Sequence, residues 1–113
     1  MKGERMGEFE ELVLLTVHGL GQGAYGVPIQ QKLERVTARP VSIGAVYAAL
    51  QRLEAKGYVR SRTGGASAVR GGRRKRFFRA TAGGLAALRD LRRVRETIWA
   101  ELDLRAPLGG GVR

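Results

Sequence analysis

The sequence predicts a mainly α-helical fold with one β-hairpin and a long helix near the C-terminal end. Three observations predict it. Apolar residues recur at helical spacing in four segments, two short segments around a Gly-rich loop favour strands, and 113 residues suffice for one domain with a short appendage. We expect the domain to span residues 1–81, the C-terminal helix 82–104, and a flexible tail 105–113.

The first predicted helix begins at Glu8 and ends at the glycines that follow residue 18. Its apolar face comprises Phe9, Leu12, Val13, Thr16, Val17 and Leu20. Leu14 and Leu15 widen this stripe beyond what a surface helix needs. We therefore expect a second subunit to cover them.

The second predicted helix opens at residues 26–28. Pro28 is tolerated in the first turn, because a backbone N–H there has no partner within the helix and its absence costs nothing. Ile29, Leu33 and Val36 give it a short apolar edge. Pro40 excludes its continuation, because the residue before a proline is pushed out of the α region. Residues 21–26 fit the dinucleotide-binding pattern G-x-G-x-x-G, but they follow a helix and not a strand, so they are interpreted as a turn.

The third predicted helix starts after Ser42, a good N-cap, and ends near Gly57. Its apolar face comprises Ile43, Val46, Leu50 and Leu53. The outward positions of its first two turns are Gly44, Ala45, Ala48 and Ala49, which are unusually small. Such a helix can approach another surface closely.

A β-hairpin is predicted over residues 58–80. The first strand covers residues 58–63 with Val59 facing inward, the flexible loop covers 64–72, and the second strand runs from Arg73 to Ala80. Thr81 then caps the last helix, whose seam comprises Ala87, Leu91, Val94, Ile98 and Leu102. This spacing is typical of helix pairing. The order of elements is that of a winged helix-turn-helix DNA-binding domain followed by a dimerisation helix.

The charge is unbalanced and unevenly placed. Twenty-one Lys and Arg residues face ten Asp and Glu, a net charge of +11, and no acidic residue stands between Ala55 and Arg89. A solvated face would mix the two signs, whereas a surface that binds phosphates would not. The sequence therefore predicts a nucleic-acid partner.

Several other classes of function are excluded by composition. The absence of cysteine excludes thiol chemistry, and the single histidine, His18, nearly excludes a metal centre built from histidines. His18 lies near the C-terminal end of the first predicted helix, where the helix dipole favours a histidine. No nucleophile–base pair or carboxylate dyad is visible, so we expect neither an enzyme nor a cofactor. The chain shows no signal peptide and no apolar run long enough for a bilayer, so we expect a cytoplasmic protein without a membrane partner.

Four segments resemble one known family. They are FEELVLL at 9–15, YGVPI at 25–29, VSIGAVYAALQRLEAKGYV at 41–59 and GGRRKRFFRAT at 71–81. Together they resemble the PadR family of transcriptional regulators over about residues 7–92, in its short subgroup with a single C-terminal helix. One departure is Phe77-Phe78, where the family often carries tyrosine.

The resemblance implies a winged-helix homodimer, paired through its first and last helices, that binds a palindromic operator and usually represses. It also implies that Tyr47 touches the DNA backbone, that Ser42 and Gly44 form the leading edge of the recognition helix, and that residues 73–76 form the wing tip. Tyr47 also fits a role in core packing. Arg52 fits either a DNA contact or an ion pair with Glu54 or Glu34.

We expect DNA contacts from Ser42, Gly44, Ala45, Tyr47, Ala48, Gln51, Arg52, Arg70, Arg73, Arg74, Lys75 and Arg76. The third helix would lie in the major groove, with the wing over phosphates or in the minor groove. We expect dimer contacts from Leu14, Leu15, Leu91, Val94, Ile98 and Leu102. Trp99 would either line a pocket for a small aromatic or cationic effector or pack in the interface.

The predicted function is a sequence-specific, ligand-responsive repressor that acts as a homodimer on double-stranded DNA. The alternative is a basic RNA-binding or architectural protein with little sequence preference. That alternative explains the charge equally well, but it explains neither the Gly- and Ala-faced third helix nor the apolar seam of the last helix.

Overall fold

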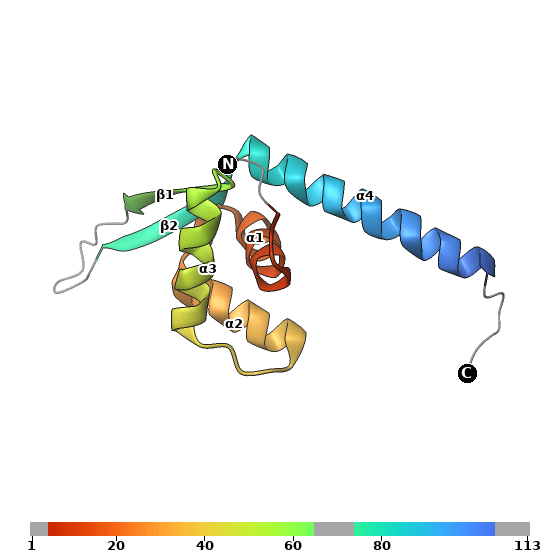
Figure 1. Ribbon diagram of the computed structural model, residues 1–113. Coiled ribbons are helices and arrows are strands. Elements are labelled where there is room, and N and C mark those ends of the chain that lie inside the picture. Colours follow the sequence, from red (N-terminus) through yellow and green to blue (C-terminus); the bar gives the residue numbers. More distant parts are fainter. Residues whose placement is uncertain (1–4, 65–73, 106–113) are drawn as a thin grey trace.

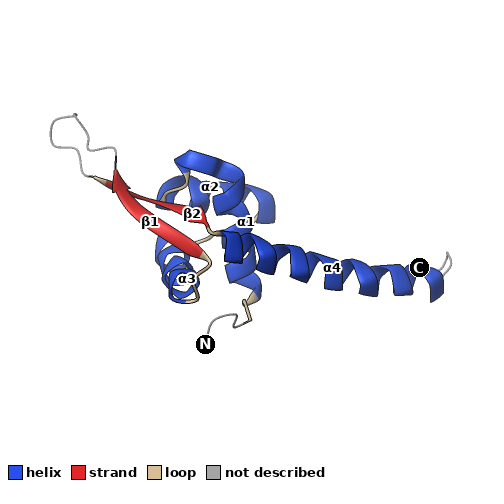
Figure 2. Cartoon of the chain, turned by 90° about the horizontal axis from the view of Figure 1, so that it is seen from above, coloured by secondary structure: helices blue, strands red, loops and turns tan. Residues whose placement is uncertain are grey.

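The computed structural model describes residues 5–64 and 74–105 (Figure 1). The elements in chain order are α1 (Glu8–Leu20), a 3₁₀ turn η1 (Gly21–Gly23), α2 (Gly26–Thr37), α3 (Ile43–Ala55), β1 (Val59–Gly64), β2 (Lys75–Ala80) and α4 (Ala82–Arg105). Helices α1 to α3 and the hairpin form one body, from which α4 projects (Figures 1 and 2). The predicted winged helix-turn-helix fold with a C-terminal helix is confirmed.

The hydrophobic core lies between the first three helices and the inner face of the hairpin. Its largest fully buried side chains are Leu14, Ile29, Leu50, Leu53, Val13, Val17, Val46 and Val59. Phe78 of β2 and Leu88 of α4 add to it. Burial of each large apolar side chain stabilises the fold by roughly 1.5–3 kcal/mol, so this one cluster holds all elements of the body together.

Three apolar positions differ from the sequence analysis in their burial. The prediction that Leu14 contacts a second subunit is wrong, because α2, α3 and β2 of the same chain surround α1 and bury Leu14 completely. Ala49, expected to face outward, is also fully buried. Val36, expected at an apolar edge, is instead mostly exposed at the end of α2. Each outcome depends on how the helices cross, which periodicity within one helix does not encode.

The helix ends follow local chemistry. The Ala45 N–H donates to Ser42 Oγ over 3.0 Å, and the Gly84 N–H donates to Thr81 Oγ1 over the same distance. Both predicted N-caps are thus confirmed. Gly57 has a φ of +82°, a left-handed conformation that turns the chain from α3 into β1.

The hairpin is antiparallel, with a register that runs from Val59 opposite Ala80 to Gly64 opposite Lys75. Both strands begin later than predicted, at Val59 and Lys75, and residues 65–73, which include most of the predicted loop, lie outside the described residues. Alternation along β1 buries Val59 as predicted, and alternation along β2 buries Phe78. The Phe78 N–H also donates to the Ala24 carbonyl over 2.8 Å, which ties β2 to the segment before α2.

The apolar contacts of helix α4 with the body lie in its first three turns. Leu85 and Ala87 pack against the core, Leu88 is buried within it, and Leu91 is half-buried. From residue 92 to residue 103 every side chain is exposed. The helix runs to Arg105, one residue beyond its predicted end, and residues 106–113 of the predicted tail lie outside the described residues.

Candidate nucleic-acid interface

The exposed face of α3 is made of small side chains. Gly44, Ala45 and Ala48 are exposed, as predicted, and Ala55 extends this face at the end of the helix. Nothing lies within 4 Å of the position that a Cβ would take at Gly44. Gln51 is exposed between them. The four small residues and Gln51 form what we call the α3 stripe, along which a ligand surface can come close to the helix backbone.

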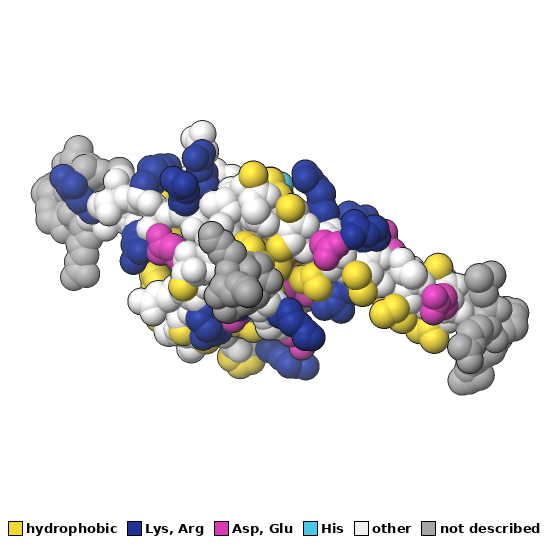
Figure 3. All heavy atoms as spheres, turned by 45° about the horizontal axis from the view of Figure 1, so that its top comes forward, with side chains coloured by type: hydrophobic (Ala, Val, Ile, Leu, Met, Phe, Trp, Pro, Cys, Tyr) yellow, Lys and Arg dark blue, Asp and Glu magenta, His cyan; other side chains and the backbone are white. Residues whose placement is uncertain are grey.

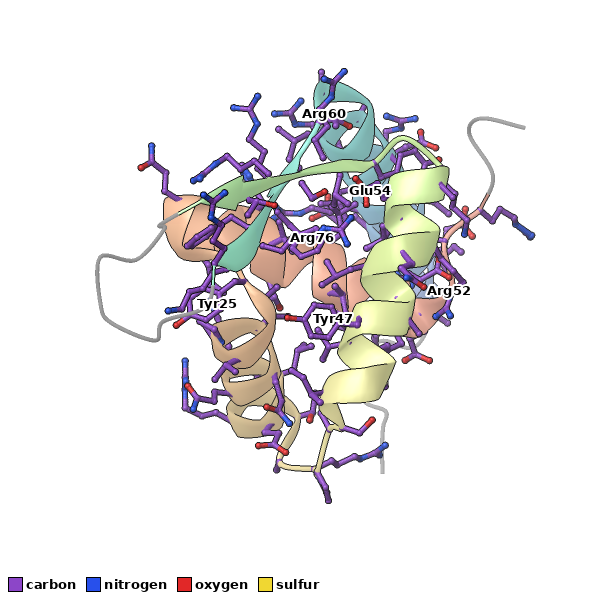
Figure 4. The ribbon with its side chains drawn as sticks, turned by 90° about the vertical axis from the view of Figure 1, so that its left-hand side faces the viewer. Tyr25, Tyr47, Arg52, Glu54, Arg60 and Arg76 are labelled. Carbon is purple, nitrogen blue, oxygen red and sulfur yellow. The ribbon has the colours of Figure 1, made fainter. Side chains whose placement is uncertain are left out.

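Tyr47 lies on one flank of the α3 stripe and points toward α2 (Figure 4). Its ring covers Gly26, where a Cβ would collide with the ring and hydroxyl of Tyr47. The side chain nevertheless remains 40% exposed. Its hydroxyl lies beside the first turn of α2, where the free backbone N–H groups favour anions. Tyr47 thus packs between two helices and still offers a hydroxyl at the surface.

Arg52 lies on the other flank and is held by α1 (Figure 4). Its Nε donates to Glu10 Oε2 over 2.6 Å, and Lys56 Nζ donates to Glu10 Oε1 over 2.6 Å. Glu10 is only 6% exposed. Neither Glu54 nor Glu34 is the partner of Arg52, so that part of the sequence analysis is wrong.

The electrostatics of Glu10 reflect this double pairing. Burial on its own raises the pKa of the Glu10 carboxyl, whereas hydrogen bonds from Lys56, Arg52 and the Gly7 N–H lower it. The hydrogen bonds outweigh burial, so the pKa of Glu10 lies below its usual value. Glu10 therefore stays ionised at neutral pH and neutralises much of the charge at this end of α3.

The predicted wing cations differ in their surroundings. Arg74 and Lys75 are exposed, and Lys75 Nζ lies 5.2 Å from the centre of the Tyr25 ring. Arg76 is held instead, because its Nη2 donates to Glu54 Oε1 over 2.9 Å and to Ser61 Oγ over 3.1 Å. Arg70 and Arg73 lie outside the described residues.

Three further arginines of the hairpin, on its outer face, are absent from the predicted site. Arg60, Arg62 and Arg79 point away from the core, and Lys and Arg side chains gather over this part of the hairpin in Figure 3. Strand alternation is the signal that could have separated them from Arg76, which shares the inner face with Phe78.

The exposed part of α4 carries a second, apolar surface. Val94, Ile98 and Leu102 are each about half exposed, and Trp99 is 64% exposed. Leu15 of α1 is also about half exposed. Arg95 Nη2 donates to Glu11 Oε1 over 2.8 Å and so ties α4 to α1. The residues predicted to pair two subunits, apart from Leu14 and the half-buried Leu91, are thus available on one chain.

A family model described as the transcriptional regulator PadR-like family matches residues 14–90. This chain belongs to the PadR-like family. Its members are transcriptional regulators and not enzymes, so this PadR-like chain is a DNA-binding regulator. The match includes the α3 stripe, the hairpin and the start of α4.

Solved structures resemble this PadR-like chain in fold. A PadR-like transcriptional regulator from Bacillus cereus has a TM-score of 0.70 at 20% identity, covering 91% of this chain and 93% of the other. A PadR-like transcription factor from Bacteroides fragilis has a TM-score of 0.63 at 24% identity, covering 86% and 84%. A PadR family regulator from Eggerthella lenta has a TM-score of 0.66 at 20% identity, covering 89% and 83%. A comparison with curated proteins found no match.

The described part of the chain lacks two other kinds of site. No helix there combines the length and apolar composition that a bilayer-spanning segment needs. No group of three or more His, Asp or Glu side chains within residues 5–64 and 74–105 is arranged to hold a metal ion.

Proposed function

We propose that this PadR-like regulator acts as a homodimer that recognises a palindromic operator and represses transcription in response to a small ligand. The observation that carries the DNA-binding geometry is the α3 stripe, exposed and small, beside the exposed cations of the hairpin. A B-DNA major groove admits one α-helix. Gly44, Ala45 and Ala48 let the α3 backbone approach base edges that longer side chains would keep at a distance.

The hairpin supplies the electrostatic part of the proposed interface. Arg74 and Lys75 are exposed next to the wing tip and have no acidic partner among the described residues. Each phosphate that such a cation neutralises contributes roughly −0.9 to the slope of log K against log salt. Tyr47 adds a hydroxyl at the first turn of α2. Because α3 carries few long polar side chains, DNA shape would contribute to sequence preference.

The proposed dimer rests on the apolar side of α4. Leu91, Val94, Ile98 and Leu102 recur at helix-pairing spacing and are partly or half exposed on a single chain. Large apolar side chains gathered on one helix face are typical of a protein interface. Two-fold pairing would present two α3 stripes to one duplex, which is why the operator would be palindromic.

The DNA proposal is tested by selecting bound duplexes from a random pool and then competing the selected site against random duplex and RNA. We expect the selected palindrome to compete at least tenfold better than either. Equal competition by all three would favour the alternative of a basic RNA-binding or architectural protein.

Replacement of residues 73–76 by alanine should weaken all DNA binding and flatten the slope of log K against log salt. An unchanged slope would count against contacts between the wing and DNA phosphates.

The dimer proposal is tested by Ile98→Asp, with Ala100→Asp as the matched control. Ala100 is also exposed but lies on the opposite side of α4 from Ile98. We expect light scattering to show monomers for Ile98→Asp and dimers for Ala100→Asp. A dimeric Ile98→Asp variant would mean that the interface lies elsewhere.

The ligand proposal concerns Trp99. In a two-fold dimer its exposed indole would form one wall of an apolar pocket for a flat aromatic or cationic molecule. We expect a planar aromatic cation to quench Trp99 fluorescence in the wild type and much less in Ile98→Asp. Quenching that is equal in both would show that the pocket does not depend on the dimer.

A further inference from the structure

Two arginines face each other across the outer side of the hairpin. In the strand register Arg60 is directly opposite Arg79, and Arg62 lies two residues further along the same face. Like charges placed opposite each other on a two-stranded sheet are destabilising. Within residues 5–64 and 74–105 no carboxylate pairs with either member, whereas Arg76 on the other face pairs with Glu54. The hairpin thus holds an uncompensated positive charge at a fixed place.

A hollow of about 610 Å³ adjoins these three arginines. His18 at the end of α1, Phe77 of β2 and Leu85 in the first turns of α4 also line it. Binding sites for small molecules commonly have volumes of about 300–1,000 Å³ and mix an apolar wall with a few polar groups. The guanidinium carbon of Arg62 lies 4.8 Å from the centre of the Phe77 ring, so charge and aromatic surface are adjacent.

This hollow is separate from the proposed DNA interface. Figure 4 shows Arg60 on the far side of the hairpin from Tyr47, and Arg76 with Glu54 between them. The outer face of the hairpin is also not the apolar side of α4, because Leu85 lies in the first turns of that helix and Trp99 lies near its other end. Neither the α3 stripe nor a dimer contact accounts for the paired arginines.

We infer that this hollow binds a small phosphate monoester that carries a flat apolar group. Three guanidinium groups match a phosphate monoester, whose charge is about −1.5 to −2 at neutral pH, better than a carboxylate with a single charge. Guanidinium groups also suit phosphate because they donate two parallel hydrogen bonds. Phe77 and Leu85 provide the apolar surface for the flat group.

The test uses the full chain and phenyl phosphate as the probe, measured by isothermal titration calorimetry. We expect saturable binding, and at least tenfold weaker binding in the double variant Arg60→Gln/Arg79→Gln. The control Arg74→Gln/Lys75→Gln removes the same charge from the same hairpin outside the hollow, and it should bind phenyl phosphate within about twofold of wild type. Absence of binding by the wild type at millimolar concentration would overturn the inference.

Two further arms test the ligand class and the location. Benzoate should bind at least tenfold more weakly than phenyl phosphate, and inorganic phosphate should also bind more weakly because it lacks the ring. Equal binding of benzoate, or equal losses in the two double variants, would overturn the inference. The Arg60→Gln/Arg79→Gln variant should keep its affinity for duplex DNA within about twofold, and a loss as large as that of the control would show that this face serves DNA instead.

A third variant guards against an effect of folding. Arg60→Lys/Arg79→Lys retains both charges and removes the guanidinium geometry, so we expect phenyl phosphate affinity between those of wild type and the glutamine variant. Circular dichroism of all variants should match the wild type. A lysine variant that binds as tightly as wild type would show that the guanidinium groups are not what recognises the phosphate, and would overturn that assignment.

Discussion

Lysines and arginines meet two different environments in this chain, one at the C-terminal end of α3 and one on the outer face of the hairpin. At the C-terminal end of α3, Arg52 and Lys56 share the buried carboxylate of Glu10. On the outer hairpin face, Arg60 and Arg79 stand opposite each other with no acidic partner in the described residues. The first pair of cations stabilises the contact between α1 and α3. The second pair costs stability, which is typical of groups kept for binding.

Arg76 falls between these two cases. It belongs to the basic run of the hairpin, yet Glu54 and Ser61 hold its guanidinium group. Both residues of the Arg76–Glu54 pair remain partly exposed. The comparison shows that membership in a basic run does not tell whether a cation is free. A carboxylate on a neighbouring element decides it.

The largest expected change in stability is that of the Glu10→Gln variant. Glu10→Gln leaves Lys56 and Arg52 without their counter-charge, and we expect a loss of about 1–3 kcal/mol in the free energy of unfolding, measured by urea denaturation. Glu96→Gln is the control, because it breaks an exposed pair with Arg92 and should cost less than about 0.5 kcal/mol. Equal losses in the two variants would contradict the idea that the buried Glu10 carboxylate stabilises the contact between α1 and α3 more than an exposed ion pair does.

The same carboxylate makes stability depend on pH. Because the pKa of Glu10 is lower in the folded chain than in the unfolded chain, its contribution is fully present above the unfolded pKa of about 4.3. The contribution is lost as pH falls through the folded pKa. We expect wild type and Glu10→Gln to converge in unfolding free energy below about pH 4. A constant difference down to acid pH would contradict this assignment.

A smaller effect is expected for Glu54→Gln, which releases Arg76. Partly exposed ion pairs contribute about 0.2–1 kcal/mol, so the loss of stability should lie in that range. The released guanidinium should steepen the salt dependence of non-specific DNA binding by up to about one unit of slope. Glu101→Gln on α4 removes the same charge far from the hairpin and should leave the slope unchanged. A slope equal to that of wild type would show that Arg76 does not reach DNA.

The smallest effect, and one of opposite sign, is expected for Arg79→Gln. Relief of the repulsion between Arg79 and Arg60 should raise the free energy of unfolding by a few tenths of a kcal/mol, or about 0.5 at most. Arg89→Gln, an exposed residue of α4, serves as the control with no expected change. A loss above about 1 kcal/mol would mean that Arg79 has a structural role like that of Arg52.

Much of the fold follows from interactions within a few residues. The caps at Ser42 and Thr81, the left-handed Gly57 and the inward Val59 were all predictable, because each depends on neighbours in the chain. The exposed Gly44, Ala45 and Ala48 followed from helical periodicity. The same periodicity failed for Leu14 and Ala49, because both lie where a second element covers the helix.

The sequence by itself determined the order of elements, the polarised charge and the small outward face of α3, since these are properties of composition and of spacing within single segments. The tertiary structure decided which charges are neutralised. Glu10 meets Arg52 across 42 positions of the chain, and Glu54 meets Arg76 across 22. Such pairs depend on how α1 crosses α3 and on the hairpin register. Both are set by the packing of the shared core and not by any local pattern.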